Sequence, residues 1–162
     1  MVHLTKIYTR TGDEGFTDLA NRERTFKTDP IIEAIGAVDE ANSAIGLMPH
    51  SDIVDYIQND LFDLGADLAR SEVKINQDRI NWLENVIDDH NEYLEPLRSF
   101  VLPTGPIHNA RSIVRRAERR VWAVDGVNPL IPKYLNRLSD LLFVMARYHN
   151  KGNEKLWQIE KQ

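Results

Sequence analysis

Apolar residues recur every three or four positions through most of the chain, and short stretches with proline or glycine interrupt the pattern. A helix has about 3.6 residues per turn, so this spacing gathers apolar side chains on one helix face. Five such segments follow residue 28, and we expect helices over about 30–48, 51–68, 76–98, 107–124 and 133–148. A chain of this kind buries its apolar faces by packing the helices together.

Capping residues and helix breakers set these boundaries. Asp29-Pro30 supplies an N-cap and a first-turn proline, and Ser51 can cap the second helix. Prolines and a glycine within 103–106 separate the third helix from the fourth. In the third segment the expected buried residues include Tyr93, Leu94 and Leu97. Short connections favour antiparallel neighbours, so the expected fold is an all-α bundle of five helices.

The length and composition predict one domain over residues 1–162. Hydrophobic residues make up 42% and charged residues 28%, which is ordinary for a globular unit. Within it we expect a polar N-terminal segment over 1–28, the bundle over 29–150 and a tail over 151–162. The tail carries Leu156, Trp157 and Ile159, enough apolar area to dock as either a strand or a short helix.

The chain contains no cysteine, which excludes a disulfide framework, a thiolate metal site and a cysteine nucleophile. The five histidines lack metal-ligand spacing, so the sequence assigns no metal site. No apolar stretch approaches the ~20 residues that span a bilayer, and the first residues lack the pattern of a secretion signal. We therefore expect a cytoplasmic protein that binds no membrane.

Acidic residues outnumber basic ones by 25 to 20, a balance that argues against a protein that coats nucleic acid. Against this background, residues 111–120 contain five arginines. Arg111, Arg115 and Arg119 fall along one stripe of the expected helix, where like charges one turn apart repel. Such a stripe is typical of a helix whose charges are neutralised by neighbouring carboxylates or by a polyanionic ligand. A solvated or intersubunit face remains open.

A polar segment over residues 6–18 combines hydroxyl side chains with glycine. Glycine permits close approach, and exposed backbone N–H groups can donate to anionic oxygens, so the segment is suited to wrap a phosphate chain. It lacks the Gly-Lys-Ser/Thr ending of a Walker A motif, and an ordinary polar loop is the alternative. Lys27 lies just before the first helix, where its charge and the helix N-terminus could face the same anion.

Two polar residues stand out within the apolar helices. Asp39 follows two apolar residues of the first helix, and we expect it to face the bundle. A carboxylate in that position needs a cation, which Arg111 or Arg115 could provide, and a purely structural ion pair is the alternative. Asn136 either joins an interhelical hydrogen-bond network or reaches a ligand.

Taken together, these segments resemble the PduO-type family of ATP:cob(I)alamin adenosyltransferases, the corrinoid adenosyltransferases. The resemblance runs through nearly the whole chain, and its carriers are Lys6-Ile7-Tyr8-Thr9-Arg10-Thr11-Gly12-Asp13, Lys27, Gly36-Ala37-Val38-Asp39-Glu40, Phe100-Val101-Leu102-Pro103, Arg115-Arg116-Ala117-Glu118-Arg119 and Tyr134-Leu135-Asn136-Arg137-Leu138-Ser139-Asp140. It implies a ferritin-like, cobalamin adenosyltransferase-like bundle with an N-terminal nucleotide-binding loop over 1–28. It further implies a homotrimer that transfers the 5′-deoxyadenosyl group of ATP to the cobalt of cob(I)alamin and releases triphosphate.

The resemblance also implies roles for individual residues. The nucleotide site would be formed by Thr9, Arg10, Thr11, Gly12, Thr17, Asp18, Lys27, Arg115, Arg116, Glu118, Arg119 and Asn136. Asp39 and Arg111 match an interhelical or intersubunit salt bridge near the corrin, and Phe100 matches an aromatic residue that displaces the lower axial ligand of cobalt. With Arg115, these three are the candidate catalytic residues. Mg²⁺ would share the phosphate charge, and the expected partners are ATP, cobalamin, a reductase and an adenosylcobalamin-dependent enzyme.

Two other functions stay open at this point. A short Pro-Thr-Gly-Pro turn connects Phe100 to the arginine helix, whereas family members usually have a longer connection. A sensor or cofactor-delivery protein that binds ATP and corrinoid with weak transferase activity is therefore the main alternative. The second alternative is a structural bundle with a basic interface, and it would give the loop at residues 9–12 no function.

Overall fold

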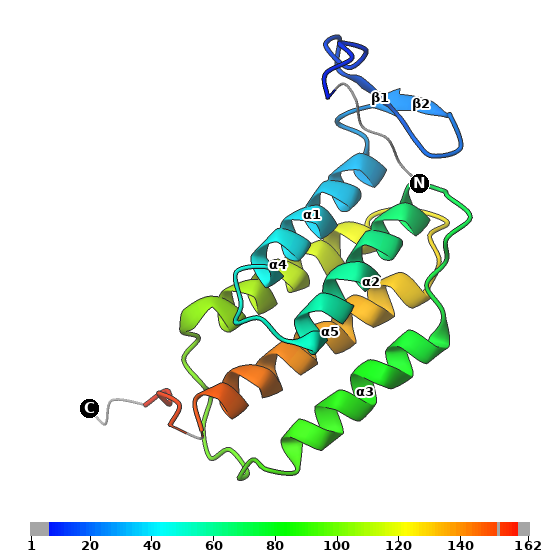
Figure 1. Ribbon diagram of the computed structural model, residues 1–162. Coiled ribbons are helices and arrows are strands. Elements are labelled where there is room, and N and C mark those ends of the chain that lie inside the picture. The colour runs from blue at the N-terminus through cyan, green and yellow to red at the C-terminus, as the bar shows by residue number, and fades with distance from the viewer. Residues whose placement is uncertain (1–6, 152, 159–162) are drawn as a thin grey trace.

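The computed structural model describes residues 7–151 and 153–158, and within them five helices follow a small hairpin (Figure 1). The strands are β1 (Phe16–Asp18) and β2 (Arg24–Phe26). The helices are α1 (Pro30–Ile45), α2 (Asp52–Leu68), α3 (Gln77–Asn91), α4 (Gly105–Trp122) and α5 (Leu130–His149). The predicted five-helix bundle is confirmed. Lys6 and Ile159, which entered the sequence arguments, lie outside the described residues.

The helix starts follow the expected caps. Asp29 caps α1 by accepting a hydrogen bond of 3.0 Å from a backbone N–H, and Ser51 caps α2 through one of 3.3 Å. Each bond satisfies a donor that a helix N-terminus leaves free. α5 begins at Leu130 rather than at the expected Lys133. Pro132 falls in its first turn, where a missing N–H removes no helical hydrogen bond.

α3 ends at Asn91, earlier than the expected residue 98. Pro96 explains the difference, because it lacks an N–H and its ring disfavours helical backbone at the residue before it. The expected burial of this stretch is also wrong in part: Tyr93 is 74% exposed and Leu97 37% exposed, while Leu94 is half-buried. Residues 92–104 cross to α4 outside any helix.

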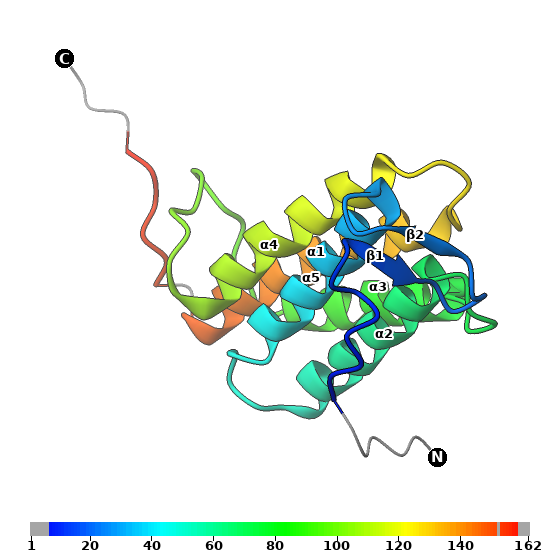
Figure 2. The same ribbon diagram turned by 90° about the horizontal axis from the view of Figure 1, so that it is seen from above.

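The core lies between α5 and its neighbours. α5 packs on α3 and α4, and α1 packs on α2 and α4, so α4 joins the two sides of the bundle (Figure 2). The fully buried side chains of α5 include Tyr134, Leu135, Leu138, Leu141 and Leu142. Removing such apolar surface from water stabilises the fold by about 25 cal/mol per Å². Among the described residues, no helix is long and apolar enough to cross a membrane.

The hairpin and the C-terminal tail lie at opposite ends of the bundle (Figure 1). The tail runs beside the segment that precedes α4. The N–H of Leu102 donates to the carbonyl of Lys155 at 2.8 Å, and the N–H of Trp157 donates to the carbonyl of Phe100 at 2.7 Å. An isolated antiparallel bridge joins the same two segments. The tail therefore docks as a strand-like segment, which decides between the two forms that the sequence left open.

Candidate functional site

The five arginines of α4 fall into two groups. Arg116 forms an ion pair with Glu40, and Arg120 forms one with Glu33 at 3.3 Å, which fastens α4 to α1. Within the described part of the chain the remaining three have no carboxylate at ion-pair distance, and these are Arg111, Arg115 and Arg119. The neighbouring helix therefore neutralises only part of the stripe.

Arg111 is half-buried against α5. Its guanidinium carbon lies 5.4 Å from the centre of the Phe143 ring, and its buried Nε has no hydrogen-bond partner among the described residues. Burial lowers the pKa of Arg111, the charge of Arg115 lowers it further, and Asp140 opposes both. A partly desolvated cation with an unpartnered donor gains from an anion that is brought to it.

Asp39 does not face the bundle. It lies on the exposed side of α1, because Ala34, Val38 and Ala41 take the buried side. Within the described ranges no ion pair joins it to Arg111 or to another cation. The expectation of a partly buried carboxylate is therefore wrong. A salt bridge between Asp39 and Arg111 remains a prediction, and it would have to form between subunits.

The hairpin turns the chain back so that Lys27 reaches the loop at residues 9–12. A Cβ on Gly12 would lie 2.9 Å from the Nζ of Lys27, so a side chain at this position would push the flexible end of Lys27 aside. The hydroxyl oxygens of Thr9 and Thr11 lie 2.9 Å apart, and between them Arg10 has a φ of 64°. The structure thus places hydroxyl groups, a sharp backbone turn and an ammonium group together on an exposed loop.

Asp18 and Thr17 lie in the hairpin itself. Asp18 forms an ion pair with Arg24 across the strands at 3.4 Å, and Arg24 also donates to the carbonyl of Thr11 at 2.9 Å. Thr17 lies opposite Thr25. Arg24 therefore ties the hairpin to the loop, a role that the sequence reasoning missed, because its one signal was a positive charge near Asp18.

Glu118 and Asn136 meet between α4 and α5. The amide of Asn136 donates to Glu118 at 3.4 Å, and Arg137 donates to the amide oxygen of Asn136 at 3.1 Å. Arg137 is itself held by Glu84 of α3 at 2.7 Å. Two of the predicted site residues are thus brought together. Arg137 and Glu84 orient them, and Glu84 gave no signal in the sequence because it comes from a different helix.

Phe100 projects into a groove at the tail end of the bundle. Its side chain is 79% exposed, and the groove is a cavity of about 760 Å³ that Phe143 and Trp157 also line. The ring centres of Phe100 and Trp157 lie 6.2 Å apart. The tail holds the backbone of Phe100 while leaving its ring exposed, an arrangement suited to contact with a large flat ligand.

The hairpin and the segment that precedes α4 lie at opposite ends of the bundle (Figure 1). Lys27 directly follows the hairpin, and Phe100 with its groove belongs to the segment before α4. α4 runs between these ends, and its 18 residues, at about 1.5 Å each, give a length of about 27 Å. The arginine stripe occupies the part of α4 between them. One chain therefore does not close the loop and the groove around the same small ligand.

Comparison with known proteins identifies the family of this chain. The family described as Cobalamin adenosyltransferase matches residues 7–149. The chain is 46% identical over 183 residues to a corrinoid adenosyltransferase of Mycobacterium tuberculosis, an alignment that covers 97% of this chain and 95% of that protein. It is 39% identical to a corrinoid adenosyltransferase of Bacillus subtilis, and this alignment covers 90% of this chain and 86% of that protein.

The fold has solved relatives as well. One is a variant PduO-type ATP:corrinoid adenosyltransferase from Lactobacillus reuteri complexed with cobalamin and ATP, which superimposes with a TM-score of 0.86 at 34% identity and covers 96% of this chain and 100% of that one. A second variant of that enzyme, also complexed with cobalamin and ATP, gives a TM-score of 0.87 at the same identity. It covers 94% of this chain and 97% of that one. The chain therefore belongs to the cobalamin adenosyltransferase family and is an enzyme with ATP:corrinoid adenosyltransferase activity.

Proposed function

We propose that Arg115 and Arg119 of α4, the loop at residues 9–12 and Lys27 bind the triphosphate of ATP, and that the groove at Phe100 holds the corrinoid. One observation carries the proposal: the guanidinium groups of Arg115 and Arg119 have no carboxylate partner among the described residues of an acidic chain. Bidentate, charge-assisted bonds to phosphate are the interaction that guanidinium groups make best. Beyond these, the proposed nucleotide site includes Thr17, Asp18, Arg116, Glu118 and Asn136.

A second copy of the chain completes the site. The loop and the groove lie at opposite ends of one chain, but a loop from one subunit can lie over α4 of the next. Contacts of this head-to-tail kind form a ring when the rotation between subunits closes, and a homotrimer is the ring that we propose. Asp39, exposed on α1, can then pair with Arg111 of a neighbouring subunit and balance the charge that this arginine lacks within its own chain.

In the proposed mechanism the corrinoid substrate supplies the nucleophile. The electron pair of Co(I) forms a bond to C5′ of ATP, the bond between C5′ and its oxygen breaks, and triphosphate leaves with that electron pair. Arg115, Arg119 and Lys27 align the chain of phosphates and stabilise the charge that grows on the leaving group. No serine, cysteine or histidine nucleophile is needed.

Phe100 acts on the other side of the reaction. Its ring would occupy the lower axial position of cobalt and exclude the ligand that normally binds there. Four-coordinate Co(II) is then easier to reduce, and a reductase supplies the electron that produces Co(I). The tail supports this role, because its hydrogen bond to the carbonyl of Phe100 holds the backbone of this residue beside the groove.

Mg²⁺ fits this site as a companion of the phosphates. Within the described ranges, no three histidine, cysteine, aspartate or glutamate side chains gather as metal ligands. Mg²⁺ commonly keeps waters and binds through phosphate oxygens, so a cage of protein ligands is not required. When bound, it would neutralise part of the triphosphate charge beside the arginines.

Calorimetry and turnover assays test the proposal. Removing one preorganised donor to a leaving group costs roughly 100- to 1,000-fold in rate, so we expect Arg115→Ala to lose about that much adenosylation and to bind ATP weakly. The fold should survive, because Arg115 is exposed. Lys133→Ala is the matched control, since this exposed lysine is not one of the proposed site residues and bonds Gln77 of α3. Unchanged rates in both Arg115→Ala and Lys27→Ala would refute the site.

A further inference from the structure

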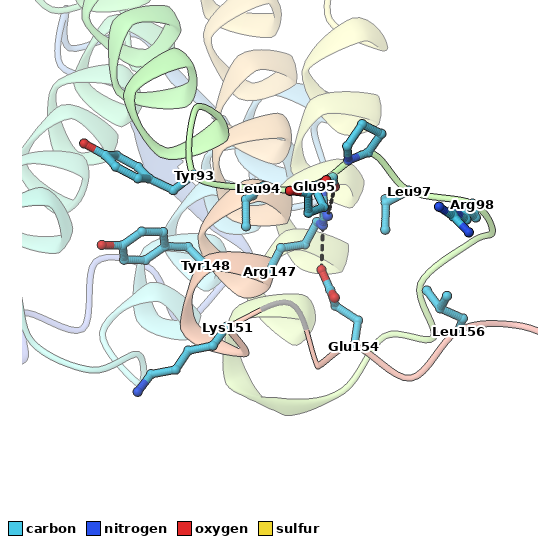
Figure 3. Close-up of a pocket in the computed structure, with 11 residues that line it drawn as sticks. Tyr93, Leu94, Glu95, Leu97, Arg98, Arg147, Tyr148, Lys151, Glu154 and Leu156 are labelled. Atoms are coloured by element: carbon cyan, nitrogen blue, oxygen red, sulfur yellow. Dashed lines mark hydrogen bonds and ion pairs between the residues drawn. The ribbon is translucent and has the colours of Figure 1, made fainter.

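A second cavity, drawn in Figure 3, shares lining residues with the groove at Phe100. It measures about 730 Å³, a size typical of small-molecule sites, and Leu97 and Arg98 line both cavities. Figure 3 shows Tyr93 and Tyr148 at one end, with Leu97 and Arg98 at the other. A ligand that enters from the groove therefore passes Arg98 before it reaches the tyrosines.

The charges around this second cavity favour an anion near Arg98. Arg147 and Glu154 neutralise each other in its wall, where their side chains lie 2.6 Å apart. Arg98 and Lys151 add two positive charges, and the exposed Glu95 removes one. Arg98 has no ion pair among the described residues. The lining therefore has one positive charge in excess, with a guanidinium group at the junction.

The far end of the cavity is aromatic and apolar. The rings of Tyr93 and Tyr148 meet edge to face with their centres 6.4 Å apart, and Leu94 lies beside them. Tyr93 is 74% exposed although it stands beside a cavity. Exposed tyrosines in this geometry give a flat group both apolar contact and a polar tip, which suits a planar heterocycle.

We propose that this second cavity binds the lower nucleotide arm of a complete corrinoid, the phosphate, ribose and planar base attached below the corrin ring. The proposal rests on the corrin site at Phe100. If Phe100 takes the position below cobalt, the base that would otherwise bind there has to move aside. The arm leaves the ring in the order phosphate, ribose, base, and the cavity offers Arg98 first and the tyrosines last.

This subsite would give the displaced base a place to bind. A base that packs against Tyr93 and Tyr148 no longer competes with Phe100 for cobalt. The arm would then contribute affinity for corrinoids that carry it, while a corrinoid without the arm would use the groove alone. Preference for complete corrinoids is the measurable consequence.

The experiment compares cobalamin with cobinamide, a corrinoid that lacks the nucleotide arm, by spectroscopic titration of their Co(II) forms with MgATP present. For an exposed charge-assisted contact with phosphate, we expect Arg98→Gln to weaken cobalamin binding about five- to tenfold. Tyr93→Ala should weaken it by about the same factor. Both variants should bind cobinamide within about twofold of the unmodified chain, because the lost contacts belong to the arm.

Lys133→Gln serves as the charge-matched control, because it removes one exposed positive charge at a distance from the cavity. It should leave both affinities unchanged. Equal weakening of cobalamin and cobinamide in Arg98→Gln, or no weakening of either, would overturn the subsite. Phe100→Ala distinguishes the two proposals: if it leaves the binding and the spectrum of both corrinoids unchanged, the corrin site itself is wrong, and otherwise only the arm subsite has failed.

Discussion

Arg147 and Glu154 form a buried ion pair that fastens the tail to α5: the Nε of Arg147 lies 2.6 Å from the carboxylate, and 8% and 4% of the two side chains are exposed. Arg147 also donates to the carbonyl of Glu95 at 2.7 Å, so one guanidinium holds both the tail and the segment after α3. Burial raises the pKa of Glu154, but the hydrogen bond and charge of Arg147 outweigh it, and the pKa is lowered overall.

Breaking this pair should destabilise the protein strongly. Glu154→Ala leaves the charge of Arg147 buried without a carboxylate partner, which typically costs about 3–5 kcal/mol of the free energy of unfolding. The control is Glu23→Ala, which breaks an exposed pair with Arg70 and should cost less than about 1 kcal/mol. Chemical denaturation monitored by circular dichroism measures both. Similar losses in the two variants would contradict the assignment of this pair as the tail's anchor.

His108 should make the stability depend on pH. It is 2% exposed, and neither ring nitrogen has a hydrogen-bond partner in the described part of the chain. Burial lowers the pKa of His108 most, and the charge of Arg111 lowers it further. The charge of Glu154 raises this pKa, but the pKa is lowered overall. The unfolded chain therefore binds a proton that the folded chain resists, and stability falls as pH drops through and below about 6.5.

Thermal unfolding at about pH 7.5, 6.5 and 5.5 checks this sign. The decline should be steeper for the unmodified chain than for His108→Leu, which keeps an apolar side chain beside Phe143 but cannot take up a proton. Parallel curves for the two proteins would show that His108 does not cause the dependence.

If the site is shared between subunits, mixing two inactive variants should restore adenosylation activity. Lys27→Ala damages the loop, and Arg115→Ala damages α4, so each variant alone should be nearly inactive. When equal amounts are refolded together, chance assembly should join an intact loop to an intact α4 at about a quarter of the sites. Adenosylation by the mixture measures this recovery. If loop and α4 of the same chain formed the site, mixing would restore nothing.

Phe100→Ala should separate reduction from transfer. Loss of the ring should reduce adenosylation from Co(II) substrate more than adenosylation from substrate already reduced to Co(I), because the proposed role of the ring precedes the alkyl transfer. The spectrum of bound cob(II)alamin with MgATP should keep the features of an axially ligated cobalt. Equal losses with both substrates would instead assign Phe100 to corrin binding alone.

The helices could be predicted in number and in most of their starts, because caps and apolar periodicity are local properties of the chain. Asp29 and Ser51 cap α1 and α2 as expected. The end of α3 was missed although its cause, Pro96, is also local. The expected burial of Asp39 failed for a different reason, since its neighbours in sequence do not tell which face of α1 the other helices cover.

Part of the candidate site could likewise be predicted from the sequence, and part of it could not. The sequence by itself determined the five arginines of α4 and the glycine-containing loop, because charge and backbone freedom belong to the residues themselves. Only the tertiary structure decided which arginines find carboxylates on α1, that Lys27 folds back onto Gly12, and that the tail holds the backbone of Phe100. These contacts join residues far apart in the chain, and their formation depends on the packing of the whole bundle rather than on any local preference.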